Sequence, residues 1–112
     1  MLNRKPFVLS VGLLAASSGI SYADELPGQQ LALDVNKGNC HACHKLPGAE
    51  RSGNIAPRLS GIAQKYPDIK QLQAFIHDPT LSNPNTIMPP YGRHGILTEQ
   101  EIVEISKFIH LL

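Results

Sequence analysis

Two cysteines and a histidine lie close together in the sequence, and their types and spacing predict chemistry most clearly. Cys40, Cys43 and His44 form a C-x-x-C-H motif, the attachment signature of c-type haem. Two thiols three residues apart on one helical turn can each form a thioether to the edge of the porphyrin. The next residue then points its imidazole at the iron. We therefore expect one covalently bound haem c, with His44 as an iron ligand.

Three other interpretations of the cysteines are weaker. A thioredoxin-type redox pair needs a strand leading into the motif within a βαβ unit, and no such strand is predicted. A structural zinc site needs four ligands, and the chain has no second cysteine pair. A disulfide between Cys40 and Cys43 would leave the adjacent His44 unexplained.

The second iron ligand is expected to come from a proline-rich loop. Met88 is followed by Pro89 and Pro90, and further prolines precede it at positions 79 and 84. A thioether is a soft, weak ligand that favours reduced iron and raises the reduction potential. The prolines restrict the loop, so less entropy is lost when the thioether coordinates. Met88 is therefore the predicted sixth ligand.

The remaining histidines are weaker candidates for that position. His77 and His94 stay open as alternatives to the methionine, although a satisfied or solvated role suits both of them better. His41, between the two cysteines, should face water. His110 is expected in the last turn of a helix, where its cationic form suits the helix dipole. Neither of these last two is expected to bind iron.

Hydrophobic periodicity indicates four short helices that would position these residues. The first places Leu31 and Val35 on one face, and the last begins at Thr98, which forms a capping box with Glu101. The four predicted ranges are 29–39, 57–66, 68–78 and 98–112. No segment alternates with period two for long enough to predict a strand. The expected fold is all-α, with about four short helices around one covalently bound haem.

The first 23 residues read as a Sec-type signal peptide. Arg4 and Lys5 form its charged region, residues 7–16 form an apolar run, and Ser21 and Ala23 offer small side chains for cleavage. The run is too short to cross a bilayer. We expect cleavage after Ala23, leaving one haem domain over residues 24–112, located in the periplasm, with no membrane anchor.

Charge excludes one class of partner. Loss of the leader removes two basic residues and leaves eight basic and nine acidic residues. No basic run remains, so binding to nucleic acid is not expected. A domain of about 89 residues is small for a core that is stabilised by packing alone, and a haem would fill that core.

The chain resembles the class I c-type cytochromes and, within them, the SoxX family, the monohaem subunit of the SoxAX complex of thiosulfate oxidation. The resemblance lies in the segments 38–44 (Gly-Asn-Cys-His-Ala-Cys-His), 55–59 (Ile-Ala-Pro-Arg-Leu), 88–92 (Met-Pro-Pro-Tyr-Gly) and 95–99 (Gly-Ile-Leu-Thr-Glu). It implies a class I cytochrome c fold with His44 and Met88 as axial ligands. It also implies that the carbonyl of Pro57 accepts a hydrogen bond from His44 Nδ1, which would fix the ring.

The same resemblance implies partners. A SoxX-like chain would pair with a haem-bearing SoxA-like subunit and pass electrons to another c-type cytochrome. Catalysis is not expected from the chain alone, because both cysteines are used for haem attachment and Met88 would occupy the sixth coordination position of the iron. Within the complex the chain would be the electron-transfer subunit of an L-cysteine S-thiosulfotransferase. The alternative is a free-standing monohaem carrier of another respiratory pathway, because the chain lacks the longer N-terminal extension of many SoxX proteins.

A docking face follows from the expected haem edge. It should be framed by Ala42 in the cysteine turn and by Ile87, Pro89, Pro90 and Tyr91 in the methionine loop. This rim is mostly apolar, so docking should depend more on shape than on charge.

Overall fold

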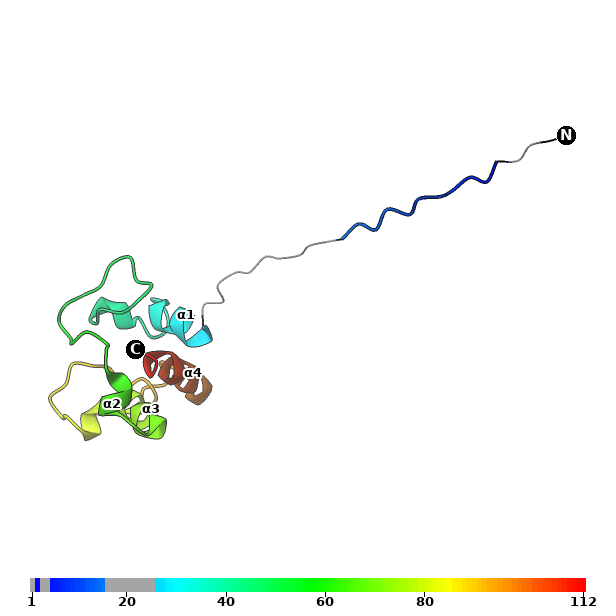
Figure 1. Cartoon of the computed structure of the whole chain (residues 1–112). Coiled ribbons are helices and arrows are strands. Elements are labelled where there is room, and N and C mark those ends of the chain that lie inside the picture. The colour runs from blue at the N-terminus through cyan, green and yellow to red at the C-terminus, as the bar shows by residue number, and fades with distance from the viewer. Residues whose placement is uncertain (1, 3–4, 16–25) are drawn as a thin grey trace.

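The computed structural model describes residue 2 and residues 5–15 and 26–112 (Figure 1). Arg4, Ala16 and the expected cleavage site after Ala23 lie outside these residues. Within the part of the chain that is described, no helix is both long and apolar enough to span a membrane.

Four α-helices and two short 3-10 helices make up the domain, and no strand occurs among the described residues. In chain order they are α1 (Pro27–Leu33), η1 (Cys40–Ala42), α2 (Ile62–Lys65), α3 (Ile69–His77), η2 (Pro79–Leu81) and α4 (Glu99–Ile109). The expected all-α fold with four short helices is therefore confirmed.

The C-terminal helix α4 is the centre of the domain, with α1 on one side and α3 on the other (Figure 1). Its start is fixed by the predicted capping box: Glu101 N donates to Thr98 Oγ1 and Thr98 N donates to Glu101 Oε1, both at 3.1 Å. Gly28 allows α1 to approach closely, because a Cβ there would collide with the backbone of Glu104. Lys37 Nζ adds an ion pair of 3.0 Å to Glu101.

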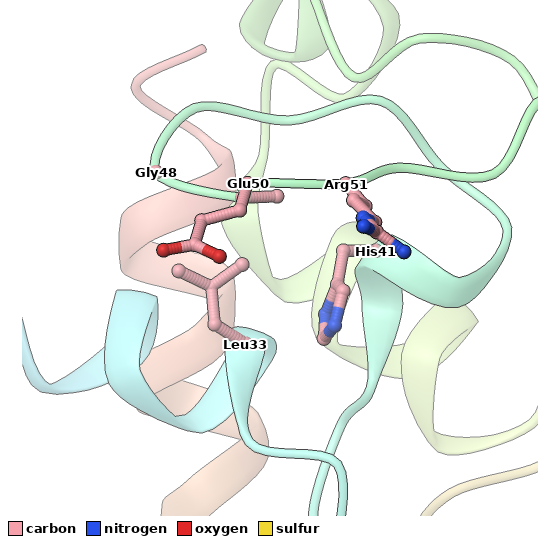
Figure 2. A pocket seen from close by; sticks show the side chains of 6 residues that line it. Leu33, His41, Gly48, Glu50 and Arg51 are labelled. Carbon is pink, nitrogen blue, oxygen red and sulfur yellow. The ribbon is translucent and has the colours of Figure 1, made fainter.

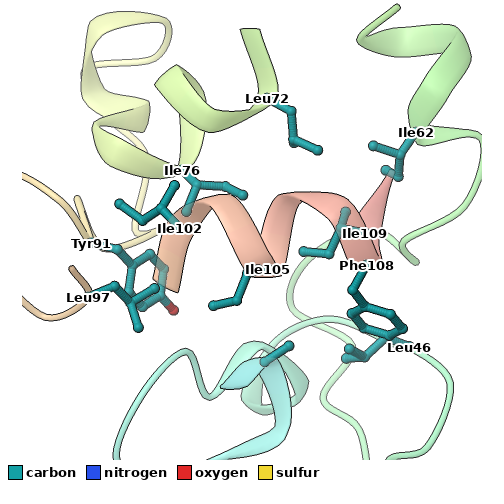
Figure 3. Close-up of a cluster of buried hydrophobic side chains, with 11 residues drawn as sticks. Leu46, Ile62, Leu72, Ile76, Tyr91, Leu97, Ile102, Ile105, Phe108 and Ile109 are labelled. Carbon is teal, nitrogen blue, oxygen red and sulfur yellow. The ribbon is translucent and has the colours of Figure 1, made fainter. Parts of the chain in front are cut away.

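One face of α4 supplies four of the eleven buried side chains of the hydrophobic core. Its buried side chains meet Leu72 and Ile76 of α3, and also side chains from the loops (Figure 3). The core members from α4 are Ile102, Ile105, Phe108 and Ile109, and those from the loops include Leu46, Tyr91 and Leu97. Leu112, beyond the end of α4, is only partly buried against this core.

Helix α3 follows the prediction closely. Asp68 caps its first turn by accepting a hydrogen bond from Lys70 N at 2.9 Å. The helix ends at His77, before Pro79, because the residue preceding a proline is disfavoured in helical conformation.

The first predicted helix is too long. Helix α1 ends at Leu33, and the Asp34 carboxylate then accepts a hydrogen bond from Asn36 N at 2.8 Å, forming a turn instead of another helical turn. Asn39 has φ 47°, a left-handed conformation that redirects the chain into the cysteine motif. Val35 is consequently 66% exposed and does not share a buried face with Leu31.

The second predicted helix is also too long. Only Ile62–Lys65 is helical, because Gly61 has φ 64° and interrupts any helix that began earlier. Pro57, expected in the first helical turn, instead lies in a loop. That loop position leaves its carbonyl available to another partner.

Candidate functional site

The cysteine motif forms a tight turn. Helix η1 begins at Cys40, and His44 N donates to the Cys40 carbonyl at 2.9 Å. Both Cys40 and Cys43 are free thiols and are half-buried. One turn of chain therefore carries two available thiols and an imidazole directly after them.

The state of the Cys40 thiol disfavours the redox-pair interpretation. Burial, with a smaller contribution from the neighbouring Cys43, raises the pKa of Cys40 to about 11. An activated redox cysteine needs a lowered pKa, because the thiolate is the nucleophile. Cys40 is therefore a protonated thiol at neutral pH.

The imidazole of His44 is held by a backbone carbonyl. Its Nδ1 lies 2.6 Å from the carbonyl oxygen of Pro57, the contact that the resemblance implies. When Nδ1 donates this hydrogen bond, Nε2 keeps its lone pair and can bind a metal. The interrupted second helix thus has a consequence for the site, because Pro57 in a regular helix would have its carbonyl engaged within that helix.

The loop that carries Pro57 folds back onto the cysteine turn. Gly53 N donates to the His41 carbonyl at 2.8 Å, and Ala56 N donates to the Cys43 carbonyl at 3.1 Å. A Cβ at Gly53 would overlap the carbonyl of Ala42. Because loop and turn pack backbone to backbone, the Pro57 carbonyl is positioned by both of them.

The methionine loop lies against the margin of the core. Met88 is half-buried and packs against the hydrophobic cluster, and its backbone N–H donates to Thr86 Oγ1 at 3.1 Å. Ile87 beside it is 76% exposed. The loop thus directs Met88 toward the core and Ile87 toward solvent.

The end of α3 anchors the chain that follows Met88. The His77 carbonyl accepts hydrogen bonds from Gly92 N and Arg93 N at 3.1 and 3.2 Å. A Cβ at Gly92 would overlap the His77 ring. Only glycine allows this approach, so the loop is pressed directly onto the helix end.

A buried carboxylate reinforces the same anchor. Asp78 is 6% exposed, accepts hydrogen bonds from Thr80 N and Thr80 Oγ1, and pairs with Arg93 Nη1 at 3.3 Å. The pKa of Asp78 is held below its usual value. The largest cause is the hydrogen bond from the Thr80 hydroxyl, and the hydrogen bond from Thr80 N and the charge of Arg93 add to it. Sequence patterns did not indicate this anchor, since nothing local relates residue 78 to residue 93.

The other histidines have partners or exposure of their own. His77 Nε2 lies 3.0 Å from Glu99 Oε1 with its side chain 41% exposed, and His110 Nε2 lies 2.8 Å from the Tyr66 carbonyl. His94 is exposed.

The expectation for His41 was wrong: its ring is half-buried and its Nδ1 is enclosed without a hydrogen-bond partner. Figure 2 shows it lining a pocket with Leu33, Gly48, Glu50 and Arg51.

The expected apolar rim is only partly exposed. Ala42, Ile87 and Pro89 are exposed, whereas Pro90 and Tyr91 are buried. Tyr91 belongs to the core, and its hydroxyl donates to the Gly38 carbonyl at 2.6 Å. The loop turns inward after Pro89, because the Tyr91 ring needs the core and its hydroxyl needs a partner.

These residues fit a covalently bound haem c. The thiols are free, His44 has a ring nitrogen available, and Met88 offers a soft thioether from a separately anchored loop. Several apolar side chains at the margin of the core are only partly buried and could pack on an apolar macrocycle, among them Leu59, Tyr66 and Met88.

Comparison with known proteins shows the family of the chain. Residues 26–112 match the family model for cytochrome c. The chain is 40% identical over 75 residues to an uncharacterized lipoprotein of Aquifex aeolicus (strain VF5). That match covers 66% of the chain but 36% of the relative, so the chain spans about a third of the length of this protein. The chain belongs to the cytochrome c family, whose domain binds haem c covalently.

Proposed function

We propose that Cys40 and Cys43 form the two thioethers to the haem and that His44 and Met88 are its axial ligands. The observation that carries this assignment is the contact of 2.6 Å between His44 Nδ1 and the Pro57 carbonyl. It fixes the ring through Nδ1 and leaves Nε2 as the ligating atom. The haem supplies an iron that accepts and returns one electron.

The chain's own contribution is to keep the iron's surroundings unchanged between oxidation states. His44 is held by a carbonyl whose loop is fixed to the cysteine turn. Met88 is carried by a loop anchored at the end of α3 through Gly92 and Arg93. Ligands that move little on electron transfer keep the reorganisation small, and a closed site excludes water and small oxidants.

We further propose that residues 1–23 are a cleaved export signal and that residues 24–112 act in the periplasm. Within that compartment the protein serves as the SoxX-like subunit of a thiosulfate-oxidising complex, beside a SoxA-like cytochrome. The support is the resemblance of the segments 38–44, 55–59, 88–92 and 95–99 to that family. A second c-type cytochrome takes the electrons onward.

A free-standing carrier is the competing function. Its support is the small exposed apolar rim, which consists of Ala42, Ile87 and Pro89 once Pro90 and Tyr91 are assigned to the interior. Brief electron-transfer encounters bury little surface, below about 1,200 Å², whereas permanent subunits bury more and bury it more apolarly.

Spectra of the exported protein test the haem assignment. The pyridine haemochrome of the wild type should be that of a haem with two thioethers, and Cys40→Ala or Cys43→Ala should shift it to that of one. The double variant should lack haem. His94→Ala, which removes an exposed histidine, is the matched control and should leave the spectrum unchanged. A double variant that keeps covalent haem would contradict the assignment.

Near-infrared absorption of the ferric protein tests the axial methionine. The wild type should show the weak sulfur-to-iron charge-transfer band, and Met88→Ala should lose it and bind cyanide faster. His77→Ala should retain the band, because the His77 ring pairs with Glu99 and packs against Gly92 and so is not an iron ligand. Bis-histidine spectra in the wild type would refute Met88 ligation.

Purification under native conditions distinguishes the two roles. A SoxX-like subunit should elute with a second haem protein at all concentrations, and removing it should abolish thiosulfate-dependent electron transfer. A monomer that exchanges electrons without a stable partner would favour the free carrier.

A further inference from the structure

A single hydroxyl joins the methionine loop to the cysteine turn. Tyr91 lies three residues after Met88, its ring is 9% exposed, and its hydroxyl donates to the Gly38 carbonyl at 2.6 Å. Gly38 lies two residues before Cys40. The hydrogen bond thus connects the two segments proposed to hold the haem, 53 residues apart in the chain.

The acceptor of this bond is fixed in place. Gly38 N donates to the Leu31 carbonyl at 3.0 Å. A Cβ on Gly38 would lie 3.0 Å from that same carbonyl oxygen and 3.1 Å from Cys40 Sγ. Gly38 is therefore wedged between α1 and the first haem-binding cysteine, and its carbonyl moves only if they move.

The donor is fixed as well. The Tyr91 carbonyl accepts hydrogen bonds from Ile96 N at 2.9 Å and Leu97 N at 3.1 Å, and the ring packs within the core (Figure 3). Burial, with the two cysteines adding to it, raises the pKa of Tyr91 to about 12. The hydroxyl accordingly keeps its proton, and remains a donor, at neutral pH.

We propose that Tyr91 is a positioning residue that keeps the Met88 thioether on the iron by tying its loop to Gly38. This inference rests on the proposed ligation by Met88. A thioether is a weak ligand, so its retention depends on how readily the loop swings away. Displacing Met88 moves Tyr91, three residues downstream, and breaks a buried hydrogen bond. The intact bond therefore disfavours the open loop.

Imidazole binding to the ferric haem protein measures that opening. Imidazole can take the sixth position only when Met88 leaves it, which shifts the Soret band and abolishes the sulfur-to-iron band. Tyr91→Phe keeps the ring and leaves the Gly38 carbonyl unsatisfied in the closed form. The dissociation constant for imidazole should fall about tenfold, the equivalent of about 1.4 kcal/mol for one lost buried hydrogen bond.

Ser106→Ala is the matched control. Ser106 is fully buried, and its hydroxyl donates to the Ile102 carbonyl at 2.7 Å within α4, so the change removes a buried hydroxyl hydrogen bond that joins neither of the two haem-binding segments. Its imidazole affinity should equal that of the wild type. If Tyr91→Phe loses thermal stability but binds imidazole as the wild type does, Tyr91 serves packing alone and the inference is overturned.

A measurement on the unaltered protein gives a second test. The Tyr91 hydroxyl proton should give a slowly exchanging NMR resonance in the ferric protein, and saturation with imidazole should abolish it. Persistence of the resonance in the imidazole complex would mean that the loop opens without breaking the bond, which refutes the coupling. Absence of the sulfur-to-iron band in the wild type would instead refute Met88 ligation, and the inference would fall with it. The two failures are thus distinguishable.

Discussion

Gly53 offers the sharpest test of how the loop around Pro57 supports the cysteine turn. We predict that Gly53→Ala destabilises the haem protein far more than Gly95→Ala. A Cβ at Gly53 would overlap the Ala42 carbonyl and lie 3.0 Å from Cys43 Cα. These are backbone atoms, so no side-chain rotation can relieve the contact. Gly95 is the converse case, with φ +66° and nothing within 4 Å of its Cβ position.

The magnitude follows from what each change breaks. Overpacking costs about 1–3 kcal/mol, and the hydrogen bonds from Gly53 N and Ala56 N to the cysteine turn add about 1 kcal/mol each. The free energy of unfolding should fall by about 3–5 kcal/mol for Gly53→Ala. At Gly95 a left-handed alanine costs about 1–2 kcal/mol, partly offset by a less flexible unfolded chain. The net loss there is about 1 kcal/mol.

Thermal unfolding of the ferric protein, followed by Soret absorbance and far-ultraviolet circular dichroism, measures both losses. A domain of this size loses about 4–8 °C of midpoint per kcal/mol. Gly53→Ala should therefore unfold at least about 12 °C below the wild type, and Gly95→Ala about 4–8 °C below it. Equal losses for the two variants would refute the argument that the loop and the turn pack backbone to backbone.

Four further changes test other parts of the structure. Thr98→Ala removes the α4 cap and should cost about 1 kcal/mol, measured by denaturant unfolding; an unchanged midpoint would contradict the role of the capping box. The fold lowers the pKa of Asp78, so the contribution of its carboxylate to the free energy of unfolding is complete above the pKa of the unfolded chain, about 4, and is lost as the pH falls through the pKa of the folded protein. The free energy of unfolding of Asp78→Asn should therefore fall less steeply below pH 4 than that of the wild type. An equally steep fall would refute this. Ile87→Glu should slow electron exchange with a partner cytochrome at an unchanged haem spectrum, and exchange by the wild type should slow only slightly as salt is raised. Pro90→Glu should instead impair folding, because Pro90 is buried, and normal folding of that variant would contradict the inward turn of the loop.

Several elements could be predicted because their causes are local. The capping box of α4 and the end of α3 before Pro79 each depend on residues within one helical turn. The cysteine motif is also local, since two thiols and an imidazole within five residues specify their own chemistry. Two predicted helices were too long because a turn at Asp34 ends the first and the left-handed Gly61 interrupts the second, and hydrophobic periodicity does not register either feature.

The sequence by itself determined the chemical groups: a pair of thiols, an imidazole beside them and a methionine among prolines, on an all-α chain. Only the tertiary structure decided how these groups are held. The Tyr91 hydroxyl meets Gly38 across 53 residues, and Arg93 meets Asp78 at the end of α3. Such contacts depend on how helices and loops pack, which no local pattern encodes. The burial of Pro90 and Tyr91 has the same cause, because a side chain faces the core only once the core exists.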